Sequence, residues 1–136
     1  MAEAKPTPLH QTIEEHSKLF RDLVLGFIKV HILHHASRDA IYGAGIILEL
    51  ERHGYRLSPG TLYPLLHTLE AAELLWREDR VVAAKVRKYH HLTLFGQEVL
   101  NEARRKAVGL VDEVTEPDTK ASARRRQAIA GPPGAS

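Results

Sequence analysis

Apolar residues recur every three or four positions through the first third of the chain. They are Leu19, Phe20, Leu23, Val24, Phe27, Ile28, Ile32 and Leu33. This spacing puts them on one face of a helix, so the pattern predicts a long amphipathic helix over residues 11–35. A polar break at residues 36–39 is expected to end it, and a shorter helix then runs to His53-Gly54. Gly54 suits the left-handed backbone that often follows a helix end.

A third helix is predicted around four leucines that share one face, Leu62, Leu65, Leu66 and Leu69. Pro64 limits where this helix begins, because a proline in a helix interior removes a hydrogen bond and clashes with the preceding turn. With Thr61 as the N-cap, Pro64 becomes the third helical residue, where its missing N–H has no partner to lose. We therefore expect a turn at residues 58–60 and a helix that begins near Thr61.

The spacing of apolar residues shortens after Leu75. Residues 76–82 and 85–92 are rich in Val, Tyr, His and Trp, which indicates a hairpin joined at Ala83-Ala84. From Thr93, a predicted N-cap, the apolar residues step again by three or four, at Leu100, Ala103, Ala107, Leu110 and Val114. Such a narrow stripe is typical of a coiled-coil seam and needs a partner. A C-terminal dimerisation helix is therefore predicted over residues 93–115.

The two ends differ in composition from this middle part. Residues 1–10 contain two prolines and few apolar groups, which predicts a flexible N-terminal tail. Residues 116–136 contain three consecutive arginines, Arg124-Arg125-Arg126, followed by Gly131-Pro132-Pro133-Gly134. This composition predicts a disordered basic tail.

The composition narrows the class of protein. The chain has 136 residues, enough for one compact domain, with 19 Lys and Arg, 17 Asp and Glu and no Cys. Disulfide scaffolds, thiolate zinc fingers and cysteine nucleophiles are thereby excluded. The first residues do not form a signal peptide, and no apolar stretch is long enough to span a bilayer, so a soluble protein is expected. No catalytic motif is present, which predicts a non-enzyme without a cofactor.

The order helix, helix, helix, hairpin, helix is that of a winged helix-turn-helix with an added C-terminal helix. We therefore predict an α+β, mostly helical fold with an N-terminal helix extension and a DNA-binding domain over residues 11–92. In such a domain two helices brace a third, whose polar side enters the major groove, while the hairpin reaches the backbone or an adjacent groove. Double-stranded DNA is the predicted partner.

The segment from Gly54 to Leu66, GYRLSPGTLYPLL, resembles the recognition-helix signature of the PadR family of bacterial transcriptional regulators. LEAAELL at residues 69–75 and RKYHHLT at residues 87–93, with Gly96, resemble the family's passages into and out of the wing. The resemblance implies a cytoplasmic homodimer that represses transcription and dimerises through its terminal helices. Some members respond to phenolic acids or other hydrophobic ligands, and the short C-terminal helix leaves such an effector open. Tyr42-Gly43-Ala44 and the wing tip depart from the family pattern.

Two sets of residues are predicted to carry this function. DNA contact is predicted for polar side chains of the third helix and cations of the hairpin, namely Ser58, Thr61, Tyr63, His67, Arg77, Lys85, Arg87 and Lys88. A two-fold interface is predicted for Phe20, Val24, Phe27, Leu100, Ala103, Ala107 and Leu110. It would set two recognition helices about one DNA turn (~34–36 Å) apart on a pseudo-palindromic operator. A helix cap for Thr61 and core packing for Tyr63 are the alternatives.

His31, His34 and His35 share one helical face, at a spacing that could chelate a metal with one more ligand. No HExxH or Glu-x-x-His pattern accompanies them, so packing is favoured and no metal is predicted.

Trp76 and the wing tip suggest two further alternatives. Trp76 follows two leucines, and we expect it in the core rather than in a ligand pocket. The apolar wing tip, residues 81–84, suggests a protein-interaction module without strong DNA binding as the alternative function.

Overall fold

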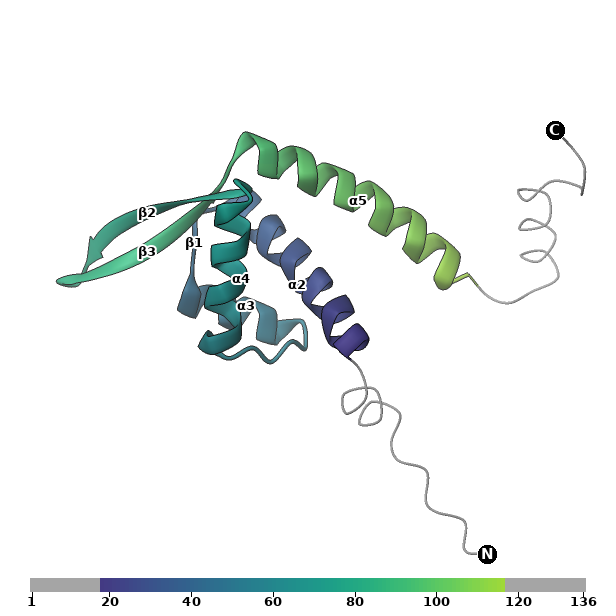
Figure 1. The fold of residues 1–136 in the computed structure, drawn as a ribbon, viewed down its shortest axis with the longest axis horizontal. Coiled ribbons are helices and arrows are strands. Elements are labelled where there is room, and N and C mark those ends of the chain that lie inside the picture. The colour runs from purple at the N-terminus through teal and green to yellow at the C-terminus, as the bar shows by residue number, and fades with distance from the viewer. Residues whose placement is uncertain (1–17, 117–136) are drawn as a thin grey trace, which may run out of the picture. The chain divides into compact units, whose positions relative to one another are not determined.

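The computed structural model describes residues 18–116 (Figure 1). Its elements, in chain order, are α2 (Lys18–Arg38), β1 (Ile41–Tyr42), α3 (Gly43–Arg52), α4 (Pro59–Ala71), β2 (Leu75–Val82), β3 (Lys85–Leu92) and α5 (Leu94–Val114). The described residues include Glu116 but nothing else of the two predicted tails. Residues 11–17 of the first predicted helix also lie outside them. The predicted mostly helical fold with a small sheet is confirmed.

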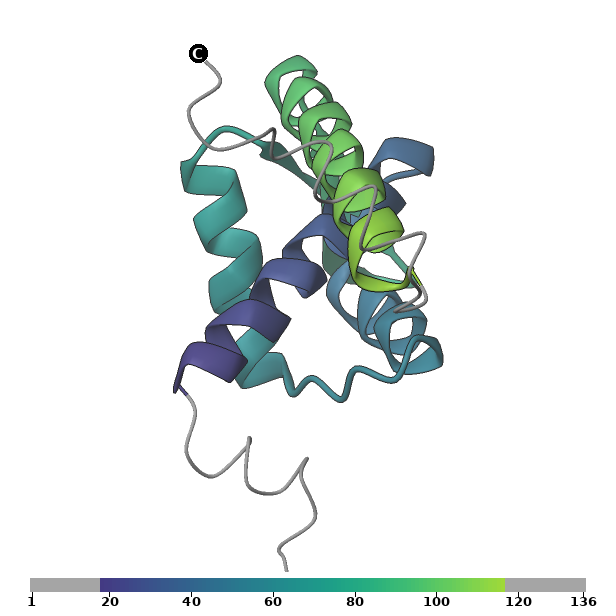
Figure 2. The same ribbon diagram turned by 90° about the vertical axis from the view of Figure 1, so that its right-hand side faces the viewer.

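The hydrophobic core lies among α2, α3 and α4 and is closed by the base of the hairpin and the start of α5. Figure 2 shows the three helices around this shared interior, and Figure 1 shows the hairpin extending away from it. Its fully buried side chains come from every one of these parts: Ile28, Ile32, Ile46, Leu50, Leu62, Leu66, Leu75 and Leu100. Removing these side chains from water is the main stabilising contribution to such a fold.

The first helix continues farther than the predicted break at residues 36–39. Ala36 is buried in the core, and α2 runs on through Arg38. The Ser37 hydroxyl donates to the His34 carbonyl, which satisfies its hydrogen bond without interrupting the helix. The predicted end of the second helix is confirmed, because α3 ends at Arg52 and Gly54 has a φ of +86°.

Helix α4 begins at Pro59, so the prediction that Thr61 is the N-cap is wrong. Ser58 takes the cap position in extended backbone, and its carbonyl accepts from the N–H groups of Thr61 (3.0 Å) and Leu62 (2.9 Å). Pro59 fits the first helical position because its fixed φ is already helical. Pro64 therefore lies inside the helix. The Thr68 hydroxyl donates to its carbonyl at 2.9 Å.

The sheet is antiparallel with the order β1-β3-β2. The two predicted strands of the hairpin are confirmed, with β2 beginning one residue earlier than expected. Ala83 and Ala84 have φ values of +51° and +61°. Both central residues of a two-residue type I′ turn need a positive φ, which Ala adopts less readily than Asn or Gly. Strand β1 was not predicted, because two residues are too short to show a period.

Helix α5 is fixed at its first turn. The Thr93 hydroxyl accepts from the Gly96 N–H at 2.8 Å, which confirms the predicted N-cap, and donates to the Glu73 carbonyl at 2.6 Å. The chain forms two compact units, one ending at Leu100 and the other beginning at Asn101. The first unit includes the start of α5 because Gly96 and Leu100 are buried. No helix among residues 18–116 has the length and apolar character needed to cross a membrane.

Candidate nucleic-acid interface

Helix α4 has two distinct sides. One side carries the four predicted leucines, all buried in the core. On the other side Tyr63 and His67, one turn apart, are exposed, and so is the capping Ser58. Thr61 is half-buried, and its hydroxyl lies 3.3 Å from that of Ser58. Three of the four α4 residues predicted to contact DNA are thus open to solvent.

Tyr63 is held against the start of α3. Its side chain is 51% exposed, and its hydroxyl oxygen lies 2.5 Å from where a Cβ on Gly43 would be. Any side chain at position 43 would displace the ring. Gly43 therefore permits the close approach that orients Tyr63, and the alternative that Tyr63 is a core residue is wrong.

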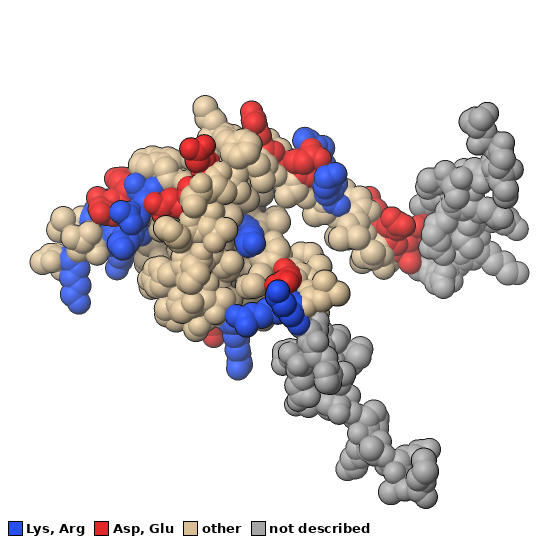
Figure 3. All heavy atoms as spheres, in the orientation of Figure 1, with Lys and Arg blue, Asp and Glu red and all other residues tan. Residues whose placement is uncertain are grey.

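The five cations of the hairpin separate into two groups. Arg77 lies 3.5 Å from Asp79, and Arg80 makes two hydrogen bonds to Glu78. By contrast, three cations have no carboxylate within 4.0 Å among the described residues: Lys85, Arg87 and Lys88. In Figure 3, blue side chains project from the wing and from the lower edge of the helical part. The unpaired group is the better candidate for phosphate contact, because no protein carboxylate competes for its charge.

Glu78 contacts two side chains of the hairpin, Arg80 and His91. Hydrogen bonds from Arg80 and from His91, whose Nε2 lies 2.6 Å away, lower the pKa of Glu78 to about 2. The carboxylate is therefore ionised throughout the neutral pH range, so Arg80 remains paired with it. Arg77, which was predicted to contact DNA, lies near a carboxylate as well, and we expect less from it than from Lys85, Arg87 and Lys88.

One face of the sheet is aromatic and exposed. Trp76 is 48% exposed and stacks on His91 with ring centroids 4.2 Å apart, so its predicted place in the core is wrong. Arg80 lies over Tyr89, and Arg87 lies 4.3 Å from the centroid of the Tyr42 ring. Neighbouring strand residues point to opposite faces, so Arg87 and Lys88 extend from opposite sides of the wing.

The predicted dimer-interface residues of the first unit have different environments. On α2, Phe27 is 44% exposed and lies in line with two more exposed residues, Leu19 and Leu23. Phe20 and Val24 are half-buried and line a cavity of about 610 Å³ together with Tyr55, Leu57 and Thr61. Leu100 is completely buried in the core of its own chain. The prediction that Leu100 contacts a partner is therefore wrong.

In the second unit, α5 carries an apolar stripe of its own. Ala103 is half-buried, and Ala107 and Leu110 are exposed. Further exposed apolar side chains follow the same helix: Val108, Val111 and Val114. An exposed apolar stripe of this length is unusual on a monomer surface and suggests a contact with another surface.

The histidines also fall into two groups. His90 lies 3.5 Å from Glu70, and His91 lies 2.6 Å from Glu78. His31 and His35, which were predicted to pack, do pack, against the ring of His53 at the end of α3. One ring nitrogen of each of the three lies within 4.8 Å of the others. His34 does not belong to this group. Sequence reasoning missed His53, because only the packing of α3 on α2 brings it there.

A basic hairpin beside a helix with one buried and one exposed side defines a winged helix-turn-helix protein. Residues 32–102 match the model of the transcriptional regulator PadR-like family, and the chain belongs to this family. It is 47% identical over 94 residues, 69% of this chain and 88% of the relative, to the transcriptional regulator Rv3488 of Mycobacterium tuberculosis.

Solved structures agree with this assignment. A PadR family regulator from Eggerthella lenta has a TM-score of 0.64 at 30% identity, covering 78% of this chain and 94% of that chain. A PadR-like transcription factor from Bacteroides fragilis also has a TM-score of 0.64, at 27% identity over 73% of this chain and 97% of that chain. The protein is therefore a transcriptional regulator of the PadR family, and the prediction that it is not an enzyme is confirmed.

Proposed function

We propose that this regulator binds double-stranded DNA as a homodimer and represses transcription. The observation that carries the proposal is an exposed α4 face beside a wing whose Lys85, Arg87 and Lys88 have no carboxylate partner within residues 18–116. In this arrangement Tyr63 and His67 reach base edges in the major groove. The three cations lie along the phosphates and displace counterions from them.

The homodimer is supported by two apolar stripes, each described within its own unit. One follows Leu19, Leu23 and Phe27 on α2, and the other follows Ala107, Leu110 and Val114 on α5. A two-fold arrangement would present two α4 helices about one DNA turn (~34–36 Å) apart, so the operator is a pseudo-palindrome. The cytoplasmic location follows from this proposal, because the regulator must reach the chromosome.

The experiment titrates the protein into a labelled promoter fragment from the gene's own locus. Fluorescence anisotropy measures the binding affinity at salt concentrations between 50 and 200 mM. A dimer that neutralises about 6–10 phosphates loses roughly a thousandfold or more in affinity across this range. Arg87→Glu/Lys88→Glu should abolish binding at physiological salt. Arg38→Glu/Lys106→Glu, with the same change in net charge outside the proposed surface, should bind within about threefold of wild type.

Repression and assembly need separate readouts. A reporter fused to the same promoter should rise when the gene is deleted, and sedimentation should give twice the chain mass. DNA binding that does not depend on salt would contradict the proposed DNA interface. An equal loss of DNA affinity in Arg87→Glu/Lys88→Glu and in Arg38→Glu/Lys106→Glu would contradict it as well. A response to small hydrophobic molecules stays a prediction, for which the cavity lined by Phe20 and Tyr55 is the candidate location.

A protein-interaction module is the second candidate. Val81 and Val86 face each other across the wing tip and are 76% and 67% exposed. On this alternative, Arg87→Glu/Lys88→Glu leaves partner binding intact, and the wild-type protein shows no salt-dependent DNA binding.

A further inference from the structure

His31, His35 and His53 form a compact group on the helical part of the first unit. His31 and His35 lie one turn apart on α2, and His53 follows the last residue of α3. One ring nitrogen of each lies within 4.8 Å of the other two. Neutral imidazole is the commonest side-chain metal ligand and suits zinc and its neighbours in the first transition row.

The backbone fixes His53 opposite the other two rings. The His53 N–H donates to the Leu50 carbonyl at 3.0 Å, and the Tyr55 N–H donates to the same carbonyl at 3.0 Å. The turn is thus closed on both sides of Gly54. The His53 and His31 ring centroids lie 4.9 Å apart, and those of Tyr55 and His31 lie 5.2 Å apart in an edge-to-face arrangement. The fold therefore fixes the backbone position from which the third imidazole extends.

Within the part of the chain that the structure describes, the ring nitrogens of this group make no hydrogen bond or ion pair. His90 and His91 each lie near a glutamate, whereas His31, His35 and His53 have no carboxylate within 4.0 Å among the described residues. The Nε2 atom of His35 is buried and has no hydrogen-bond partner in the described part of the chain. A buried ring nitrogen without a partner is costly, and a metal ion would satisfy it.

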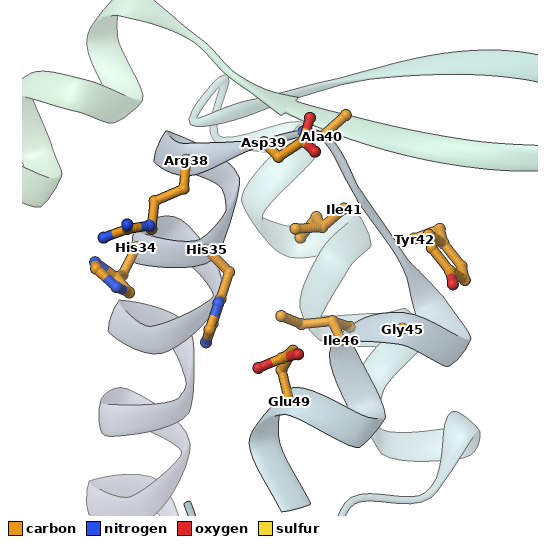
Figure 4. A pocket seen from close by; sticks show the side chains of 10 residues that line it. All are labelled: His34, His35, Arg38, Asp39, Ala40, Ile41, Tyr42, Gly45, Ile46 and Glu49. Atoms are coloured by element: carbon orange, nitrogen blue, oxygen red, sulfur yellow. The ribbon is translucent and has the colours of Figure 1, made fainter. Parts of the chain in front are cut away.

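His34 is a natural comparison within the same helix. Figure 4 shows the His35 side chain directed toward α3, on the side of Ile46 and Glu49, and the His34 side chain on the other side of α2.

We propose that His31, His35 and His53 bind one divalent transition metal ion, with Zn²⁺ as the expected occupant and water in the fourth position. Zn–N bonds of about 2.0–2.1 Å bring tetrahedral ligand atoms to roughly 3.3 Å from one another, so the rings need only a small closing movement. Three imidazoles with one open position is a known zinc arrangement. The ion would join α2 to the turn that leads into α4.

The test uses the untagged, full-length chain after treatment with a chelator. Calorimetric titration with Zn²⁺ should give one ion per chain, and Co²⁺ should produce the intense visible absorption of tetrahedral coordination. Saturating Zn²⁺ should raise Tm by roughly 5–10 °C, because the metal binds the folded chain. His31→Ala and His53→Ala should each weaken binding at least about tenfold and remove the Co²⁺ band.

His34→Ala is the matched control, since it removes a histidine of the same helix that does not join the group. It should keep the stoichiometry and the Co²⁺ band. His53 is exposed, so His53→Ala should fold, and circular dichroism in chelator checks this. Stoichiometric binding that survives His53→Ala, equal loss in His34→Ala, or the absence of a tetrahedral Co²⁺ spectrum would each overturn the site. None of these measurements involves DNA, so they are independent of the proposed function.

Discussion

The helical part and the wing of the first unit are built by different means. In the helical part, leucine and isoleucine side chains from α2, α3 and α4 are fully buried around one interior. In the hairpin, only Leu75 and His90 are buried. Besides the backbone pairing of the strands, its side chains are joined by ion pairs, stacked rings and cation–π contacts between exposed or half-buried groups. The helices are therefore held by burial, and the wing is held by cross-strand pairs of smaller individual value.

This difference matters for the proposed interface. Helix α4, anchored by four buried leucines, presents Tyr63 and His67 from a rigid base. A wing with little buried surface opens locally at lower free energy, which would let its cations adapt to DNA in the proposed complex. Substitutions in the helical part should therefore change the stability of the whole protein, and substitutions in the wing should change the free energy of unfolding much less.

The largest effect is expected in the helical core. Leu66→Ala removes a side chain that is 1% exposed and should lower the free energy of unfolding by about 2–5 kcal/mol. Leu48→Ala on α3 is the matched control, because Leu48 is 60% exposed, and it should change stability by less than about 0.5 kcal/mol. Urea denaturation of both variants measures the difference, and similar losses would contradict the assigned core.

A smaller loss is expected where the wing joins α5. A Cβ on Gly96 would lie 2.2 Å from the Leu74 carbonyl oxygen and 2.7 Å from Leu92 Cδ1. Gly96→Ala should therefore destabilise by about 1–3 kcal/mol. Gly109→Ala in the same helix meets no atom within 4 Å and should stabilise by roughly 0.5–1 kcal/mol. Thermal unfolding should therefore show a lower Tm than wild type for Gly96→Ala and a higher Tm for Gly109→Ala.

The pH dependence of stability should report on His90, where the wing contacts α4. Burial lowers the pKa of His90 below its ordinary 6.5, although Glu70 acts in the opposite direction. Arg77 and His91 also face the ring and lower its pKa further. The folded chain thus binds fewer protons than the unfolded chain below about pH 6.5, so stability falls as the pH drops toward the folded pKa.

His90→Gln should flatten this part of the curve of Tm against pH between 7.5 and 5.5. His67→Gln, at an exposed position on α4, is the control and should leave the curve unchanged. An unchanged slope in His90→Gln would contradict the assignment.

The smallest effect is expected at the wing turn. Ala83 and Ala84 both adopt positive φ, so Ala83→Asn/Ala84→Gly fits the same backbone without strain. This pair should stabilise the protein by about 0.5–1 kcal/mol and leave DNA affinity within about twofold. Chemical denaturation and the promoter titration check the two parts. A loss of stability would show that the turn has a different geometry.

Much of the helical part was predictable, because a helical period extends over many residues. The leucines of α4, the end of α3 at Gly54 and the Thr93 cap all have local signals that survive folding. The start of α4 was predicted wrongly, because the conflict at Pro64 outweighed the simpler fact that Pro59 suits a first helical position.

The candidate sites were harder to predict, because they depend on contacts between distant segments. Trp76 lies next to leucines in sequence, yet the alternation of a strand turns it outward onto His91. His53 joins His31 and His35 only after α3 packs on α2. Leu100 fits the apolar stripe of α5 equally well, but because it lies near the start of the helix it is buried in the core of the first unit instead.

In the contact between Gly43 and Tyr63, one residue would touch an operator, and the other sets the orientation of that residue. A change at position 43 could redirect operator choice in a descendant of this regulator while every side chain on the reading surface stayed the same. Comparing the surface residues of two such regulators would then miss the cause of their different targets, which would lie one helix earlier in the chain.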